Sequence, residues 1–405
     1  METLKFLMVS SHYPPSHLGG DAVMVQYLSN ELTRRGHEVH VLHDPAVYSL
    51  VRKARVDSLY SIDEQGPVLH TPALRSTRAG IILRLSLEWS EKAKAEVRRL
   101  SRELSIDVVH WHNTKGFIGH PFPSPGRTTL YTAHDYYLVC PRSNLARPNM
   151  SFCQKPLLCQ TCLLRWKKPP QLWRVGSKRV IRLMPEIEVI SPSEFMAKRL
   201  KQDGLSVHHL LRNFVPDIVA NGPSGDASIL YVGMLEVHKG PRTLLEAFAR
   251  CRDSQGFKLH IVGEGSLKDE LRARVQELGL TGRVNVPGFI PRSEVQSLLM
   301  NSTAMVIPSE WPENAPLTAL ESLSMGVPVL GSDQGGLPEI LGPEFGSVIF
   351  KAKATDELAK EIVALWERRD DMGGERRKAR IAYESRFSPD VHLDQYMRIV
   401  DNGRD

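Results

Sequence analysis

This sequence of 405 residues lacks any long hydrophobic run. No stretch approaches the roughly 18 apolar residues that a membrane-spanning helix needs, which excludes an integral membrane protein. With 41% hydrophobic and 24% charged residues, the chain is not a disordered one either. At roughly 150 residues per domain, its length predicts two domains.

The first residues also lack the apolar core of a secretory signal, because only Phe6 to Val9 form a continuous apolar stretch. We therefore expect a cytoplasmic protein. Cysteine is scarce, with five residues in the whole chain, and disulfides are not expected in a cytoplasmic protein.

Acidic residues are missing from one segment. The formal net charge is +6, but residues 1–212 carry a net +12 and the remainder a net −6. Residues 136–185 contain ten Lys or Arg and no Asp or Glu. One half of the chain is therefore basic, and its charge is concentrated in one segment.

The same basic segment holds Cys140, Cys153, Cys159 and Cys162, spaced C-x12-C-x5-C-x2-C. In a chain without a secretory signal this pattern favours a metal site with thiolate ligands over disulfides. We expect structural zinc, while an iron–sulfur cluster and no metal at all stay open. A metal would pin a segment with too little apolar surface to fold alone.

Trp166 and Trp173 accompany the basic residues of this segment, and aromatic plus cationic side chains suit a membrane interface. We expect peripheral attachment to the inner, anionic face of a membrane and an anionic or lipid-linked acceptor. Residues 78–104 mix basic and acidic side chains, which indicates a solvated helix. A zinc module for nucleic acid lacks its paired histidines here, so no nucleic-acid partner is expected.

Short β-branched runs alternate with helix-length amphipathic segments in both halves, which predicts an α/β protein with two parallel sheets. A linker is expected at residues 213–225. The predicted strands of the first half are 5–9, 38–42, 106–110, 128–132 and 187–190, and those of the second half are 229–232, 258–262, 284–286, 304–307 and 328–330.

Polar or glycine-rich residues follow most of these strands, where ligands of open parallel sheets bind. Gly19 and Gly20 separate the first strand from a helix, and paired glycines let a backbone approach a phosphate. Lys239 stands before a helix in the second half, where it can reach a bound phosphate. We expect the loops of both halves to face one another across an interdomain cleft.

The segment PENAPLTALE carries the strongest signal. Pro316 is placed to open a helix, which would leave the N–H groups of Leu317 and Thr318 free to hold a diphosphate. Glu321, about one turn into the helix, can accept two hydrogen bonds from ribose hydroxyls. Glu313, in the preceding loop, can do the same for a sugar.

With these segments the sequence resembles family-4 glycosyltransferases of the GT-B fold over nearly its whole length. The resemblance is carried by HLGGDAV, TAHD, SPSEF, YVGMLEVHKG, VGEG, VPGF, PENAPLTALESLSMGVPVL and GGLPE. It implies two Rossmann-like domains, an acceptor-side one at 1–212 with a returning helix at 386–405 and a donor-binding one at 226–385. It also implies transfer from a nucleotide-diphosphate sugar with retention of configuration and no catalytic metal, in keeping with the lack of any Asp-x-Asp triplet.

Carried over by position, the resemblance assigns Lys239 to the donor diphosphate, Glu321 to the ribose, Glu313 to the donor sugar and His134 to the reacting sugar. It implies a UDP-sugar, or next GDP-mannose, as donor of a hexose to a glycan or lipid-linked acceptor in bacterial surface polysaccharide synthesis. Expected donor-binding residues are Gly19, Gly20, Gly233, Arg242, Gly263, Glu264, Asn314, Ala315, Pro316, Leu317, Thr318 and Glu321.

The chain departs from the family at one position, since Met234 stands where related sequences have Arg after the glycine of the strand. Losing one of two cations weakens a diphosphate clamp. Arg242 or His238 is expected to compensate, and Arg242 is the better candidate because it stays charged. The alternative is a non-catalytic sugar-nucleotide-binding subunit.

Overall fold

The chain divides into two compact units, residues 1–212 with 393–405 and residues 213–392. Each unit is built on its own parallel sheet. The computed structural model describes residues 2–16, 19–45, 48, 66–72, 77–87, 91–118, 120–124, 127–148, 152–154, 159–172, 186–218, 227–251 and 256–403.

The sheet of the first unit has the strand order β3-β2-β1-β4-β5-β6-β7. The interior strand β1 pairs in parallel with β2 and β4, and its residues Phe6 to Val9 are wholly buried. A strand covered on both faces needs such a continuous apolar run. The strands are β1 (Lys5–Val9), β2 (Glu38–Leu42), β3 (Val68–His70), β4 (Val108–Trp111), β5 (Thr128–Thr132), β6 (Glu188–Ser191) and β7 (His209–Leu210).

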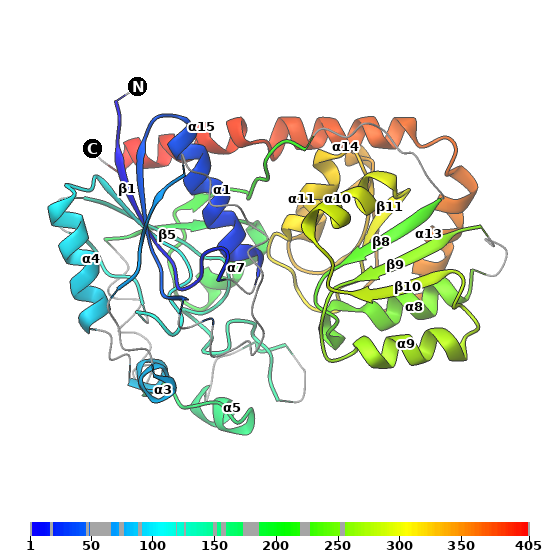
Figure 1. Ribbon diagram of the computed structural model, residues 1–405, viewed down its shortest axis with the longest axis horizontal. Helices are drawn as coiled ribbons and strands as arrows, with labels where there is room; N and C mark the ends of the chain where they lie inside the picture. Colours follow the sequence, from blue (N-terminus) through cyan, green and yellow to red (C-terminus); the bar gives the residue numbers. More distant parts are fainter. Residues whose placement is uncertain are drawn as a thin grey trace. The chain divides into compact units, whose positions relative to one another are not determined.

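Helices connect these strands and pack beside the sheet (Figure 1). The residues predicted as one solvated helix form two, α3 and α4. Ser193 caps α7, because its Oγ accepts a hydrogen bond from the N–H of Met196 at 3.3 Å. The helices of this unit are α1 (Gly20–Arg34), α3 (Arg78–Leu87), α4 (Glu91–Glu103), α5 (Cys159–Arg165) and α7 (Glu194–Gln202).

The second unit has the strand order β10-β9-β8-β11-β12-β13. Its strands are β8 (Ser228–Val232), β9 (Lys258–Val262), β10 (Val284–Gly288), β11 (Ala304–Ile307), β12 (Val329–Ser332) and β13 (Val348–Phe350). Its helices are α8 (Pro241–Ala249), α9 (Lys268–Glu277), α10 (Arg292–Asn301), α11 (Leu317–Ser324), α12 (Leu337–Ile340), α13 (Thr355–Arg368) and α14 (Gly373–Arg386), with 3-10 turns η2 (Val237–Lys239) and η3 (Pro343–Phe345).

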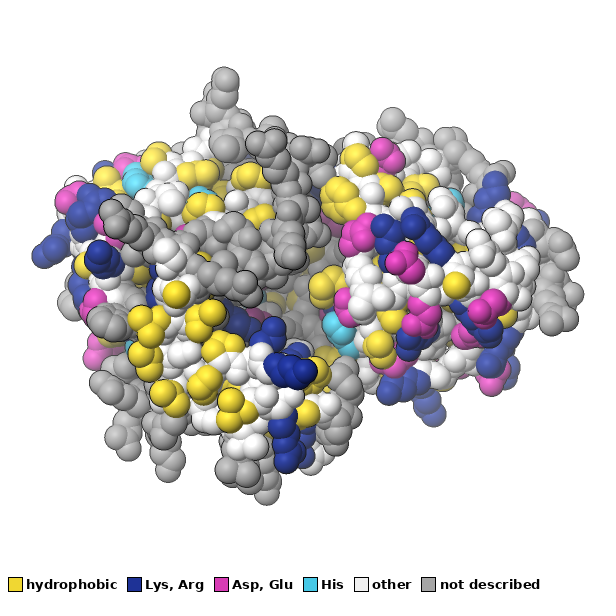
Figure 2. Space-filling view, turned by 60° about the horizontal axis from the view of Figure 1, so that its bottom comes forward, with side chains coloured by type: hydrophobic (Ala, Val, Ile, Leu, Met, Phe, Trp, Pro, Cys, Tyr) yellow, Lys and Arg dark blue, Asp and Glu magenta, His cyan; other side chains and the backbone are white. Residues whose placement is uncertain are grey.

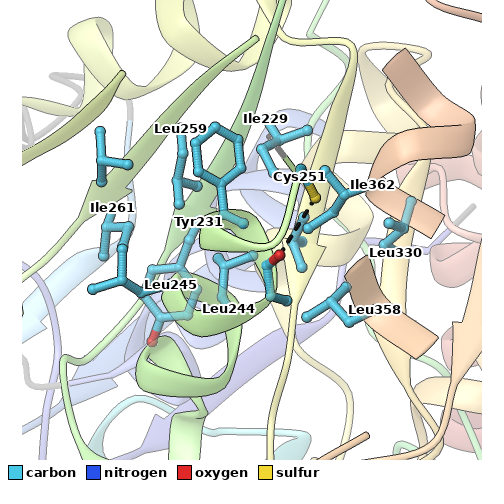
Figure 3. Close-up of a cluster of buried hydrophobic side chains, with 14 of the residues drawn as sticks. Ile229, Tyr231, Leu244, Leu245, Cys251, Leu259, Ile261, Leu330, Leu358 and Ile362 are labelled. Carbon is cyan, nitrogen blue, oxygen red and sulfur yellow. Dashed lines mark hydrogen bonds between the residues drawn. The ribbon is translucent and has the colours of Figure 1, made fainter. Parts of the chain in front are cut away.

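Helices cover both faces of this second sheet, with α8 and α9 on one side and α10 and α11 on the other (Figure 1). Between the sheet and α8 and α13 lies a core of buried side chains that includes Ile229, Leu244 and Ile362 (Figure 3). Cys251 belongs to this core, and its thiol donates to the carbonyl of Ala247 at 3.3 Å. The core fixes where each strand ends, and therefore where the loops that follow the strands lie.

The last helix, α15 (Pro389–Asn402), belongs to the first unit from Leu393 onward. Tyr396 is fully buried there, and its hydroxyl lies 3.0 Å from His110 Nδ1. Thr128 also donates to the carbonyl of Gly403 at 3.1 Å. These contacts tie the end of the chain into the first unit. Of the predicted linker at 213–225, residues 219–225 lie outside the described residues.

The cysteine segment does not form the expected metal site. Within the described ranges, which include all four cysteines, no three His, Cys, Asp or Glu side chains are arranged to hold a metal ion. Cys140 packs in the hydrophobic core of the first unit, and Cys153 packs against that core. Cys159 and Cys162 both lie on α5, in its first turn. The described residues therefore do not support the structural-zinc hypothesis.

Hydrogen bonds and a cation–π contact hold this segment instead. Gln160 donates to the carbonyl of Gln171 at 2.6 Å and accepts from its N–H at 2.9 Å. The Gln171 side chain donates to the carbonyl of Pro141 at 3.2 Å, and the Arg142 guanidinium lies 3.7 Å from the centre of the Trp166 ring. The predicted interface residue Trp173 lies outside the described residues.

Candidate functional site

The second unit brings together Lys239 and Glu313, which stand 74 positions apart in the sequence. Lys239 ends the turn η2 after β8, and Glu313 lies in the loop after β11. Because β8 and β11 are neighbouring parallel strands, the loops after them meet at one edge of the sheet. Lys239 Nζ lies 2.7 Å and 2.9 Å from the two carboxylate oxygens of Glu313.

Glu313 is held as a carboxylate. Burial opposes its ionisation, but Lys239, a hydrogen bond from the Ser309 hydroxyl and the nearby His238 outweigh burial and keep the pKa of Glu313 below its ordinary value. Ser309 is itself anchored, since its carbonyl accepts from the Ser332 hydroxyl at 2.7 Å. A carboxylate can accept about four hydrogen bonds and an ammonium can donate three. The pair therefore keeps capacity for a hydroxyl-bearing and an anionic ligand.

Helix α11 follows this pair directly. Pro316 is the residue before the helix, in an extended conformation, and not its first residue as predicted. Across the described part of the chain, no group accepts a hydrogen bond from the N–H of Leu317 or Thr318. Glu321, one turn into α11, pairs with Arg292 of α10 at 2.6 Å. Ala315 accepts from the Asn213 side chain at 3.3 Å, which orders the loop that carries Asn314.

Two glycines of the predicted site are required by the backbone. Gly263 has φ +143°, and a Cβ there would lie 1.8 Å from the carbonyl oxygen of Gly233. Gly335, from the GGLPE segment, has φ +68°, and a Cβ there would lie 2.1 Å from the carbonyl oxygen of Glu313. Glycines at these positions let the loops after β8, β9, β11 and β12 pack backbone against backbone. Glu264 pairs with Lys268 at 2.8 Å and accepts from the N–H of Phe289 at 3.1 Å.

The position of the missing cation is occupied by an exposed side chain, since Met234 is 49% exposed. Its carbonyl accepts from the Tyr231 hydroxyl at 2.7 Å, which fixes the loop after β8. Arg242, the expected substitute, pairs with Glu270 of α9, and both side chains are exposed. Compensation by Arg242 therefore stays a prediction, and it requires the guanidinium to leave Glu270.

The first unit places its own polar groups at the carboxyl edge of its sheet. Gly19 precedes α1 in extended conformation, and Gly20 is the first residue of that helix. His134 follows β5, and its Nε2 lies 3.0 Å from Nδ1 of His112, which follows β4. Burial lowers the pKa of His134, and the carboxylate of Asp21 partly offsets this effect.

Asp135 lies beside His134 and accepts a hydrogen bond from the N–H of Tyr137 at 2.7 Å. Burial raises its pKa to about 6, although Lys115 and hydrogen bonds favour the charged form. Asp21 accepts from the Asn113 side chain at 2.8 Å. This edge therefore presents neutral imidazoles and hydrogen-bonding groups with little net charge.

No individual role was predicted for four residues of these two sites, Ser309, Arg292, Asp21 and His112, although Ser309 and His112 lie in the polar loops expected to bind a ligand. Ser309 stands four residues before Glu313 and Asp21 stands directly after Gly20, so both lie inside motifs that were recognised for other residues. Arg292 follows the VPGF loop, and nothing in its local pattern indicates its pairing with Glu321. His112 follows a strand, as His134 does, and this position after a strand indicates a role at the site.

Family models match the chain almost from end to end. Residues 18–217 match the model "Glycosyltransferase Family 4", and residues 218–385 match the model "Glycosyl transferases group 1". The two models thus match the two units in turn, and the second model includes the Lys239–Glu313 pair. The chain belongs to the family-4 glycosyltransferases of the GT-B fold, and it is a glycosyltransferase with two Rossmann-like domains.

Individual relatives agree with this family. The MMP alpha-(1->4)-mannosyltransferase of Mycolicibacterium hassiacum is 26% identical, over 82% of this chain and 82% of its own. The lipopolysaccharide 1,6-galactosyltransferase of Salmonella typhimurium is 31% identical, over 36% of this chain and 42% of its own. The structure of Anabaena HepE with UDP and glucose superposes with a TM-score of 0.70 at 17% identity, over 98% of this chain and 99% of its own.

Proposed function

We propose that this enzyme transfers a hexose, with retention of configuration, from a UDP-sugar to a glycan or lipid-linked acceptor of bacterial surface polysaccharide. The observation that carries the proposal is the Lys239–Glu313 pair beside the N–H groups of Leu317 and Thr318. These groups supply positive charge and hydrogen-bond donors for a diphosphate, and one carboxylate for sugar hydroxyls.

The chemistry follows from where charge develops. As the glycosidic bond breaks, the sugar becomes oxocarbenium-like and the diphosphate gains negative charge. Fixed donors aimed at the leaving group stabilise this charge, and one such donor is worth 10²–10³ in turnover. Lys239 and the two N–H groups would serve here, and the departing phosphate oxygen would take the proton of the attacking acceptor hydroxyl. In this assignment Glu321 binds the ribose, so its ion pair with Arg292 must give way to hydrogen bonds from the ribose hydroxyls.

Two relatives bear on which base the donor nucleotide carries. The structure of Anabaena HepE was solved with UDP and glucose, and its fold is that of this chain. The mannosyltransferase relative keeps GDP-mannose as the second candidate. Thermal stabilisation by UDP, GDP and ADP separates them: we expect UDP to raise the unfolding temperature most, and a larger shift with GDP would overturn the choice of base.

Activity separates the enzyme from the alternative of a non-catalytic binding subunit. Release of the nucleoside diphosphate is measured over a panel of sugar nucleotides with the wild type and with Glu313→Ala. We expect release by the wild type with one donor and a loss of at least about 100-fold in the variant. Donor binding without release by the wild type would favour the binding subunit. Equal release by both proteins would remove Glu313 from the site.

We also propose that the enzyme attaches peripherally to an anionic membrane. On α3, Ile82, Leu83 and Leu87 are exposed, and Leu164 of α5 is 61% exposed. Figure 2 shows hydrophobic side chains gathered on this face of the first unit beside a cluster of Lys and Arg. The exposed basic residues next to Leu164 are Arg165, Lys167 and Lys168. An apolar patch bordered by cations complements an anionic bilayer. Among the described residues, no helix is long and apolar enough to cross a membrane.

A further inference from the structure

His112 and His134 form a buried imidazole pair in the first unit. They follow the neighbouring strands β4 and β5, and Nδ1 of His112 lies 3.0 Å from Nε2 of His134. Their rings stack with centroids 5.2 Å apart and an interplanar angle of 27°. His112 is only 2% exposed, whereas His134 is partly exposed. The His112 ring is thus buried, while the His134 ring is partly accessible to solvent.

A hydrogen bond between two ring nitrogens needs one proton. Burial lowers the pKa of His134 and lowers that of His112 well below its ordinary value, and in His112 the neighbouring His110 and His134 act in the same direction. Both rings are therefore neutral near pH 7, and each carries its single proton on one of two nitrogens. Either His112 donates from Nδ1 to His134, or His134 donates from Nε2 to His112.

The other nitrogen of His112 decides between these arrangements. Its Nε2 is buried, and within the described residues it meets no hydrogen-bond partner. If His134 donated, the proton of His112 would sit on this nitrogen as a buried N–H without an acceptor, which folded proteins rarely tolerate. If His112 donates, its proton is used and Nε2 carries only a lone pair.

The surrounding charges agree with this choice. The ring of His110 lies tilted against that of His112 with centroids 4.0 Å apart, and the two His110 nitrogens lie within hydrogen-bond distance of the Tyr396 and Thr132 hydroxyls. The charged group that acts on His134 is Asp21, whose carboxylate raises its pKa. Nε2 of His134 faces His112, so its other ring nitrogen is Nδ1. The negative charge of Asp21 favours a proton over a lone pair on that nitrogen.

We propose that His112 is a positioning residue: its Nδ1–H donates to Nε2 of His134 and holds His134 as the Nδ1–H tautomer. His134 then donates from Nδ1 to a hydroxyl of the donor sugar. The first step stands on the geometry of the pair alone, and only the second rests on the proposed function. In the wrong tautomer, Nδ1 of His134 would present a lone pair and could only accept.

Three replacements of His112 distinguish the effect of its hydrogen-bond donor from the effect of its side-chain volume. His112→Asn places a side-chain amide near the position of Nδ1, His112→Gln places it near Nε2, and His112→Phe keeps a ring without a donor. The matched control is His37→Asn, another buried histidine at the opposite edge of the same sheet, whose Nδ1 accepts from the N–H of Leu4 at 3.2 Å. An asparagine there can still accept that hydrogen bond.

The tautomer is read by ¹⁵N NMR of histidine-labelled full-length protein without substrate. We expect His134 as the Nδ1–H tautomer in the wild type, in His37→Asn and in His112→Asn, and a mixture of tautomers in His112→Phe. A dominant Nε2–H tautomer of His134 in the wild type would overturn the proposal whether or not the protein proves active.

Turnover with the best sugar nucleotide is measured in parallel. We expect kcat to fall about tenfold in His112→Phe and His112→Gln, the factor that one hydrogen bond supplies, and to recover in His112→Asn. If His112 only packs, kcat should fall equally in His112→Asn and His112→Gln, in step with their unfolding temperatures. That result would overturn the positioning role. If the wild type transfers no sugar, the proposed function fails while the NMR result still decides the tautomer.

Discussion

Replacing Lys239 by methionine probes the central pair of the second unit. The Lys239 side chain is 26% exposed and that of Glu313 is 13% exposed, so the variant leaves a largely buried carboxylate with Ser309 as its remaining donor. Breaking a fully buried ion pair costs about 3–5 kcal/mol, and a hydrogen bond to a charged group about 1.5–3 kcal/mol. Because this pair is partly exposed, we expect a loss of about 2–3 kcal/mol in the free energy of unfolding.

The assay is a double-mutant cycle with denaturant unfolding at pH 7. Glu313→Gln in the Lys239→Met background removes the uncompensated charge and is expected to recover about 2 kcal/mol. The control is Lys353→Met, which removes a surface lysine 3.7 Å from Glu310 and should change stability by less than about 0.5 kcal/mol. Lys239→Met within 0.5 kcal/mol of the wild type would refute the energetic argument.

The same cycle has a defined dependence on pH. Because the folded protein holds the pKa of Glu313 below its ordinary value of 4.5, the carboxylate adds stability above pH 4.5 and loses it as the pH falls through the lowered value. The difference between the wild type and Lys239→Met should therefore shrink at acid pH. A difference that grows on acidification would show that the pair does not stabilise the ionised form.

Three further predictions concern other parts of the chain. Asp135→Asn should raise the free energy of unfolding at pH 7 by about 1–3 kcal/mol. The reason is that burial raises the pKa of Asp135 to about 6, so the wild type loses stability as the pH rises from 3.8 through 6. Equal free energies of unfolding for both proteins at pH 7 would contradict this. Gly263→Ala should cost about 3 kcal/mol or more, measured against Gly282→Ala, where a Cβ meets nothing within 4 Å; two similar losses would contradict the packing argument. Leu164→Ser should reduce flotation with anionic vesicles, whereas the equally exposed Ile381→Ser in the second unit should not; equal flotation with neutral and anionic vesicles would remove the electrostatic contribution.

Much of the fold could be predicted because local pattern and burial coincide. The strands at 5–9, 38–42, 128–132, 258–262 and 304–307 have the predicted bounds. These strands lie inside the sheets, where burial on both faces favours β-branched and apolar side chains, and such residues make up most of each run. The short edge strands β3, β7 and β13 were missed, since two or three residues at a sheet edge need no such run.

The candidate site was predictable where one motif holds all its parts, as in the loop that leads from Glu313 to Glu321. It was not predictable where partners come from distant elements. Arg292 reaches Glu321 across 29 positions, and His110 reaches Tyr396 across 286. The cysteine spacing suggested metal ligands, whereas among the described residues no group is arranged to hold a metal ion, with Cys159 and Cys162 on α5 and Cys140 in the core.

Local sequence was enough to specify the two parallel-sheet halves, the loops that follow their strands and the family to which those loops belong. These features depend on hydrophobic periodicity and on short motifs, and both can be read directly from consecutive residues. The pairing of Lys239 with Glu313, of Glu321 with Arg292 and of His112 with His134 became apparent in the folded chain alone. Such pairs form because strands distant in sequence become neighbours in a sheet, and only that neighbourhood sets the charge and the proton positions of the site.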